Sequence, residues 1–220
     1  MKLLLTSAGL ANNSIIKALQ ELVVKPFSKL KVAFIPTASN LEEGDKQDWL
    51  IEDLIQLKNL KFNSIDIIDI SALPKEIWLE RLKDVDIIYV EGGNTYHLMY
   101  WFNKSGLSEI LAELLKTKVY IGVSAGTVAI TPSLLNDPES REAISQTNET
   151  IYDNGLSLVN FMIEPHINSG WFLDSTLESL EKRSKDYLYS IYGIDDNTAI
   201  KVDGDKIEII SEGVWKKFKK

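Results

Sequence analysis

The sequence predicts a doubly wound α/β fold with a mostly parallel sheet and a β-hairpin near its carboxyl end. Short apolar segments of β type alternate with longer segments of helical periodicity, which is the pattern of βαβ units with right-handed crossovers. Several of the β-type segments are almost continuously apolar, which is typical of strands covered on both faces. The length of 220 residues suits one domain, and we expect residues 1–220 to form a single α/β domain.

The first half of the chain carries five β-type segments with helical segments between and after them. The segment Val85–Val90 reads VDIIYV and illustrates the apolar character of these strands. The expected strands are Lys2–Thr6, Leu30–Ile35, Ser64–Ile70, Val85–Val90 and Lys118–Val123. The expected helices are Asn13–Leu22, Asp45–Leu57, Pro74–Lys83, Thr95–Lys104 and Ser108–Lys116.

The second half is less regular. Residues 132–155 are rich in loop-forming residues, and they precede an expected strand, Ser157–Glu164, and an expected helix, Ser175–Tyr189. Near the end, two β-type segments, 198–202 and 206–210, flank Asp203-Gly204-Asp205. Asp-Gly favours the positive φ angles of tight hairpin turns, so these segments predict the β-hairpin.

Composition excludes several classes of function. The chain has 24 Lys and Arg, 32 Asp and Glu and a net charge of −8, so an extended nucleic-acid groove is not expected. It has no cysteine and two histidines, which argues against disulfides, zinc sites and a cysteine nucleophile. We therefore expect neither a metal nor a cofactor. No segment is long and apolar enough to cross a membrane, and a cytoplasmic protein without membrane partners is expected.

The most informative motif is Gly122-Val123-Ser124-Ala125-Gly126, which follows an apolar strand and precedes a helical pattern. This Gly-x-Ser-x-Gly context is that of a nucleophile elbow, where a strained turn exposes the serine hydroxyl. The amide of Ala125 is then placed to stabilise an oxyanion. The alternative is that this five-residue pattern occurs by chance and marks an ordinary turn.

A glycine loop, Gly92-Gly93-Asn94-Thr95, also follows an apolar strand and opens a helix. Ligands of open α/β sheets bind at the carboxyl ends of the strands, so this loop should lie near Ser124. We expect the Gly93 amide to be the second oxyanion donor. The alternative is a tight turn that leads into a capped helix.

A serine nucleophile needs a base, and only His97 and His166 are available. His166 follows an apolar strand candidate at Pro165 and should lie at the rim of the sheet, so it is the favoured base over His97. The histidine in turn needs a carboxylate to fix its tautomer. The candidates near the site are Asp137, Glu139, Glu142 and Glu164.

With these motifs and Asn136-Asp137 and Pro165-His166, the chain resembles the peptidase E family of serine peptidases, which includes aspartyl dipeptidases and relatives of cyanophycinase. The resemblance runs from about Leu4 to Ile210. It implies a three-layer α/β/α fold like that of class I glutamine amidotransferases, with serine in place of their cysteine. It also implies a triad and an oxyanion hole. Matched by motif, the implied triad is Ser124, His166 and Asp137, and the implied oxyanion donors are Gly93 and Ala125.

The resemblance further implies that the partner is a small peptide substrate, such as a dipeptide with an N-terminal aspartate. Asn94, Thr95, Arg141 and Arg183 are the candidate substrate-binding residues, since an arginine could pair with a substrate carboxylate. Two alternatives stay open: an esterase-type serine hydrolase, and a non-catalytic module that binds a small ligand. A monomer or a homodimer is expected.

Overall fold

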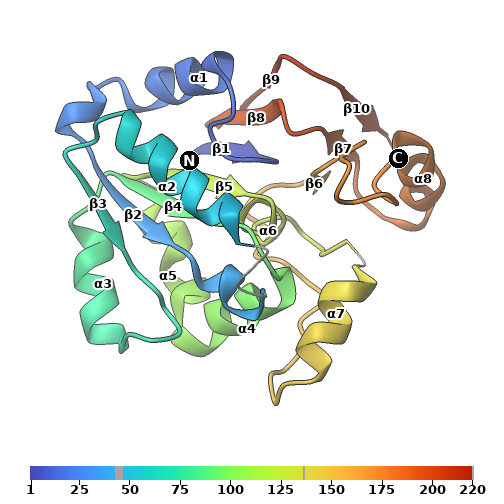
Figure 1. Ribbon diagram of the computed structural model, residues 1–220, viewed down its shortest axis with the longest axis horizontal. Helices are drawn as coiled ribbons and strands as arrows, with labels where there is room; N and C mark the ends of the chain where they lie inside the picture. Colours follow the sequence, from blue (N-terminus) through green and yellow to red (C-terminus); the bar gives the residue numbers. More distant parts are fainter. Residues whose placement is uncertain (43–46, 136, 220) are drawn as a thin grey trace.

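A large, mostly parallel sheet forms the centre of the protein. The computed structural model describes residues 1–42, 47–135 and 137–219. The strand order of the large sheet is β3-β2-β4-β5-β1-β8-β9, and every neighbouring pair from β3 to β1 is parallel (Figure 1). Its strands are β1 (Lys2–Thr6), β2 (Lys31–Ile35), β3 (Ser64–Ile67), β4 (Ile87–Val90), β5 (Val119–Val123), β8 (Thr198–Asp203) and β9 (Lys206–Ser211).

Helices cover both faces of this sheet. In β1, Leu4 faces one apolar cluster with α1 and α2, whereas Leu3 and Leu5 face another with α3, α4 and α5. The alternation follows from the two-residue period of a strand, and it explains why the strand sequences are continuously apolar. These helices are α1 (Asn13–Val23), α2 (Asp48–Asn59), α3 (Lys75–Lys83), α4 (Thr95–Ser105) and α5 (Leu107–Leu114).

Local signals set the ends of these helices close to their expected positions. Asn12 caps α1 by accepting the Ile15 amide, and Asn94 caps α4 by accepting the His97 amide, at 3.0 Å each. Gly106 is left-handed and separates α4 from α5. The expected first residues of the second helix, Asp45 and Lys46, lie outside the described residues. Short 3-10 turns occur at Phe27–Lys29, Thr37–Leu41 and Ser184–Asp186.

The predicted hairpin is confirmed as β8 and β9. Asp203 pairs with Lys206, and Gly204 at the turn has φ of +61°. β8 lies antiparallel to β1, so the hairpin extends the parallel sheet at its edge.

A small second sheet lies beside the hairpin edge of the large one, and it differs from the sequence prediction (Figure 1). The expected strand Ser157–Glu164 is reduced to β6, and the expected helix Ser175–Tyr189 to α8. β7 and β10 were not expected, and neither was α7 within the loop-rich segment. The elements are β6 (Met162–Glu164), β7 (Ile191–Ile194), β10 (Trp215–Phe218), α7 (Pro138–Ser145) and α8 (Leu177–Arg183). In the described ranges, no helix is long and apolar enough to cross a bilayer.

Candidate active site

Ser124 occupies a sharp turn between β5 and the single-turn helix α6 (Ala125–Val128). Its φ of +46° and ψ of −107° are strained values for a residue with a Cβ atom. The surroundings hold this backbone in place: the Ser124 amide donates to the Thr6 carbonyl at 3.1 Å, and the Thr127 hydroxyl donates to the same oxygen at 2.8 Å. At Gly126, a Cβ would lie 2.2 Å from the Val90 carbonyl oxygen, so only glycine allows α6 to approach β4.

His166 lies beside this serine, as the sequence predicts. Its Nε2 is 2.9 Å from the Ser124 Oγ, and its side chain is 16% exposed. The residue follows β6 and has φ of +59°, another strained value, and its backbone amide donates to the Ser7 Oγ at 2.8 Å. Ser7 comes directly after β1, so the large sheet fixes the position of a histidine that the small sheet supplies.

The carboxylate at His166 is Asp196, which is not among the acids predicted from the sequence. The Asp196 Oδ1 is 2.6 Å from the His166 Nδ1, and the Ser7 hydroxyl donates to the same oxygen at 2.7 Å. With Nδ1 donating to Asp196, Nε2 is free to accept the Ser124 proton. Asp196 lies in the connection between β7 and β8, directly beyond the short apolar segment Ile191–Ile194. The local signal is a pair of acids, Asp195 and Asp196, after a β-type segment, and it does not single out Asp196.

The environment keeps Asp196 ionised. Burial alone would raise the pKa of its carboxyl, but the hydrogen bond and charge of His166 and the Ser7 hydroxyl outweigh burial and lower the pKa below its usual value. The site therefore presents an ionised carboxylate to the imidazole at neutral pH.

Asp137, the acid implied by the resemblance, does not contact His166, and this prediction is wrong. It caps α7 instead, accepting the Ser140 amide at 3.1 Å and the Ser140 hydroxyl at 2.6 Å. The physical reason is local: an aspartate before Pro138 is a preferred N-cap, since proline suits the first position of a helix. Glu164, another candidate acid, forms an ion pair with Arg183 instead, at 2.8 Å from its Oε1. Asn136 lies outside the described residues.

The glycine loop runs next to the serine. A Cβ at Gly92 would lie 3.3 Å from the Cβ of Ser124, which places the two loops in contact. Gly93 has φ of +120°, and a Cβ there would lie 2.4 Å from the Ala38 carbonyl oxygen, so this conformation requires glycine. Among the described residues, the Gly93 and Ala125 amides have no hydrogen-bond acceptor. Both are therefore available to a ligand.

Most of the other predicted substrate-binding residues already have partners within the protein. Asn94 caps α4 and donates its Nδ2 to the Ser140 carbonyl at 2.8 Å, and Thr95 is the first residue of that helix. Arg141 pairs with Asp153 and lies over the Tyr96 ring at 5.5 Å. Together with the Arg183–Glu164 pair, this leaves neither candidate arginine unpaired.

His97, the rejected candidate base, has a separate partner. Its Nδ1 is 2.6 Å from the Glu149 Oε2, and its side chain is 6% exposed. Its ring also makes an edge contact with Trp101 at 6.3 Å. These contacts hold the helix α4 against the segment after α7, and they are consistent with the preference for His166.

Two buried acids, Glu91 and Asp53, lie under the glycine loop, and Glu91 contacts it directly. Glu91 is completely buried and accepts the Gly92 amide at 2.7 Å, while Asp53 of α2 accepts the Tyr89 hydroxyl at 3.1 Å. The two carboxyls also interact with each other. Burial raises the pKa of Asp53 to about 6, and burial and the charge of Asp53 raise the pKa of Glu91 well above its usual value.

We expect Glu91→Gln to weaken the fall in stability that the wild-type protein shows as pH rises above the usual pKa range of a glutamate. A raised pKa means that the folded state holds more protons than the unfolded state, so the free energy of unfolding falls as pH rises through this range, by up to about 1.4 kcal/mol per pH unit for one proton. Glutamine keeps an acceptor for the Gly92 amide and cannot ionise. Urea unfolding from pH 5 to 9 should give a flatter profile for Glu91→Gln than for wild type, with the exposed Glu76→Gln as control. Parallel profiles for all three proteins would contradict this assignment.

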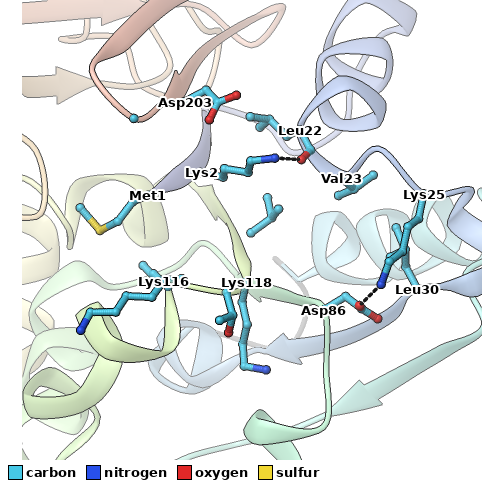
Figure 2. A pocket seen from close by; sticks show the side chains of 14 residues that line it. Met1, Lys2, Leu22, Val23, Lys25, Leu30, Asp86, Lys116, Lys118 and Asp203 are labelled. Carbon is cyan, nitrogen blue, oxygen red and sulfur yellow. Dashed lines mark hydrogen bonds and ion pairs between the residues drawn. The ribbon is translucent and has the colours of Figure 1, made fainter.

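A cavity of about 400 Å³ opens at the opposite end of the strands, around Lys2 of β1 and Val119 of β5 (Figure 2). Two of its lysines have partners within the protein: Lys2 donates to the Leu22 carbonyl at 2.8 Å, and Lys118 donates to the Val85 carbonyl at 2.7 Å. Because Ser124 lies beyond the carboxyl end of β5, this cavity is remote from the serine and belongs to no part of the site.

Comparison with known proteins shows the family of the chain and similar folds. The model of peptidase family S51 matches residues 3–210. A Listeria monocytogenes protein named "Uncharacterized peptidase Lmo0363" is 32% identical over 177 residues, covering 80% of this chain and 83% of its own. "Peptidase E" of Nostoc sp. is 28% identical over 228 residues, covering 99% of this chain and 88% of its own.

Solved structures show the same similarity. A crystal structure from Listeria monocytogenes EGD-e, described as a candidate peptidase E, has a TM-score of 0.78 at 29% identity and covers 96% of this chain and 98% of its own. A peptidase from an acI-B1 Actinobacterium, 20% identical with a TM-score of 0.66, shares the fold; it covers 99% of this chain and 93% of its own. The chain therefore belongs to peptidase family S51, a family of serine peptidases.

Proposed function

We propose that this peptidase hydrolyses short peptides with Ser124 as nucleophile, His166 as general base and Asp196 as the acid that orients the histidine. One observation carries the proposal: the continuous contacts from the Ser124 Oγ to the His166 Nε2 at 2.9 Å, and from the His166 Nδ1 to the Asp196 Oδ1 at 2.6 Å. This is the geometry that a serine hydroxyl needs to lose its proton near neutral pH. The triad thus includes Asp196 in place of the expected Asp137.

The reaction proceeds through an acyl-enzyme. His166 takes the Ser124 proton at Nε2 while Oγ forms a bond to the scissile carbonyl carbon. The imidazolium, stabilised by Asp196, gives this proton to the departing amine as the carbon–nitrogen bond breaks. Water then attacks the acyl carbon and gives a proton to Nε2. The ester bond breaks as that proton returns to the Ser124 oxygen, which restores the free enzyme.

The oxyanion of each tetrahedral intermediate would be held by the Gly93 and Ala125 amides. Three features support this: their proximity to Ser124, the absence of other acceptors among the described residues, and the glycine-specific backbone at Gly93. In this interpretation the turn at Ser124 is a nucleophile elbow. The three layers around it would be those of class I glutamine amidotransferases, with serine in place of cysteine.

The alternatives have less support. In α/β-hydrolase esterases the histidine normally follows the last strand, but here β7, β8, β9 and β10 all follow His166. A module that only binds ligand has no need of a histidine hydrogen-bonded on both nitrogens between a serine and an ionised acid. A preference for N-terminal aspartate is a prediction of the resemblance, but the two paired arginines offer it no free cation. Cytoplasmic location and monomeric or dimeric state also remain predictions.

A serine-reactive probe together with a dipeptide library tests the proposal. A sulfonyl fluoride should label one site, Ser124, as read by peptide mass mapping, and the labelled protein should no longer release amino acids from dipeptides. The library includes Asp-Leu and Leu-Leu, so it also tests the preference for aspartate. Faster turnover of p-nitrophenyl esters with no dipeptide cleavage would favour an esterase. Absence of labelling, with a ligand that raises the melting temperature, would favour the binding module.

A further inference from the structure

Three consecutive apolar side chains, Trp171, Phe172 and Leu173, are exposed in the loop that follows His166. Trp171 is 91% exposed, Leu173 79% and Phe172 47%, although all three are large and apolar. Exposed apolar groups that cluster next to a reactive centre mark a binding surface more often than a random patch does. We call these three residues the apolar segment.

The apolar segment is joined directly to the catalytic histidine. The Phe172 ring stacks on the His166 imidazole with a centroid distance of 4.6 Å and an interplanar angle of 15°. The loop that carries it is closed at its base, because the Asn168 amide donates to the Ser175 carbonyl at 2.7 Å. The Ser175 hydroxyl donates to Glu164 at 3.0 Å, and Glu164 is paired with Arg183. The base of the loop is thus fixed, while the tips of Trp171 and Leu173 are open to a ligand.

The chemistry decides which part of a substrate meets this surface. His166 gives its proton to the departing amine, so that amine must come within hydrogen-bond distance of Nε2. The residue that carries the departing amine therefore lies on the histidine side of the scissile bond. Phe172 covers one face of the imidazole. A departing residue bound at Nε2 would therefore extend its side chain toward the loop that carries Phe172.

The charges in the loop favour an apolar side chain on the departing residue. Asp174 follows the apolar segment directly, and the nearby Arg183 is already paired with Glu164. An acidic side chain would therefore meet the like charge of Asp174, and the loop from Asn168 to Ser175 contains no lysine or arginine to offset it. An apolar side chain would cover Trp171 and Leu173 and remove them from water.

We propose that Trp171, Phe172 and Leu173 form a subsite for a bulky apolar side chain on the residue directly after the scissile bond. The inference rests on the proposed function and specifies its substrate: short peptides whose departing residue is of leucine or phenylalanine type. Differences of a few carbon atoms in an apolar pocket change kcat/KM by about 10- to 200-fold.

The test compares two dipeptide series on wild type, the double variant Trp171→Ala/Leu173→Ala and the control Ile77→Ala. Ile77 is 49% exposed on α3, which lies at the β3 edge of the molecule (Figure 1). In the Ala-Y series, Y is Gly, Ala, Leu, Phe or Asp; in the X-Ala series, the first residue varies in the same way. Sulfonyl fluoride labelling of Ser124 and circular dichroism are measured for each protein, and sedimentation velocity gives its oligomeric state.

For wild type and Ile77→Ala, kcat/KM for Ala-Leu and Ala-Phe should exceed that for Ala-Gly by at least about 10-fold. The double variant should lose most of this preference, with kcat/KM for Ala-Leu and Ala-Phe falling toward that for Ala-Gly, while the sulfonyl fluoride still labels Ser124. The inference is overturned if the double variant keeps the preference, if the preference lies only in the X-Ala series, or if Ala-Asp is the best substrate. It is also overturned if the double variant merely converts a dimer to a monomer with unchanged specificity. Absence of labelling and of turnover in wild type would overturn the proposed function itself, and the subsite with it.

Discussion

Ser124→Ala is expected to lower kcat for dipeptide hydrolysis by about a million-fold, with no change of fold. The variant keeps the Cβ that already tolerates φ of +46° at this turn, and it removes only the oxygen that lies 2.9 Å from the His166 Nε2. Since covalent catalysis depends on that oxygen, no acyl-enzyme can form. The measurement is turnover of a preferred dipeptide at saturating concentration, with circular dichroism and thermal melting as checks of structure.

The matched control is Ser145→Ala, which removes an exposed hydroxyl of α7 that donates only to the Glu142 carbonyl. This variant should retain wild-type turnover. Residual activity of Ser124→Ala above about 1% of wild type, in protein free of contaminating peptidase, would show that another group attacks the substrate.

Asp196→Asn is expected to lower kcat by about 10,000-fold while KM changes little. The asparagine amide can donate to Nδ1 and so favours the tautomer in which Nε2 carries the proton, which cannot accept one from Ser124. It also removes the negative charge that stabilises the imidazolium. Because the pKa of Asp196 is lowered, protonation of this carboxyl should reduce wild-type activity only at pH values below the usual range for aspartate.

Asp137→Ala tests whether Asp137 or Asp196 is the acid that catalysis requires. Loss of the α7 cap should cost about 1 kcal/mol of stability, measured by urea unfolding, and leave kcat within about twofold of wild type. If instead Asp137→Ala abolishes turnover and Asp196→Asn does not, the assignment derived from the contacts of His166 is wrong.

The sequence predicted the parallel strands and the two central residues of the site because their signals are local. An apolar strand, a serine between glycines and a helix start all lie within about ten residues around Ser124. His166 was identifiable because the chain has one alternative histidine, and His97 lies within a helical pattern. These inferences needed no knowledge of how distant segments pack.

The role of Asp196 and the form of the small sheet depend on tertiary contacts, so local sequence patterns alone do not predict them. Asp196 is separated from His166 by 30 positions, and no local pattern distinguishes it from other loop acids. β10 reads Trp215-Lys216-Lys217-Phe218, which resembles a solvated charged tail; its lysines instead lie over aromatic rings, Lys217 over Tyr192 at 4.8 Å. The ammonium groups remain at the surface while the strand pairs with β7.

The division of the site between two sheets has a consequence during biosynthesis. The hydroxyl at position 124 belongs to the large sheet, whereas its base follows β6 and its acid follows β7 in the small one. In the proposed mechanism, a growing polypeptide therefore lacks the acid that orients His166 until residue 196 has left the ribosome.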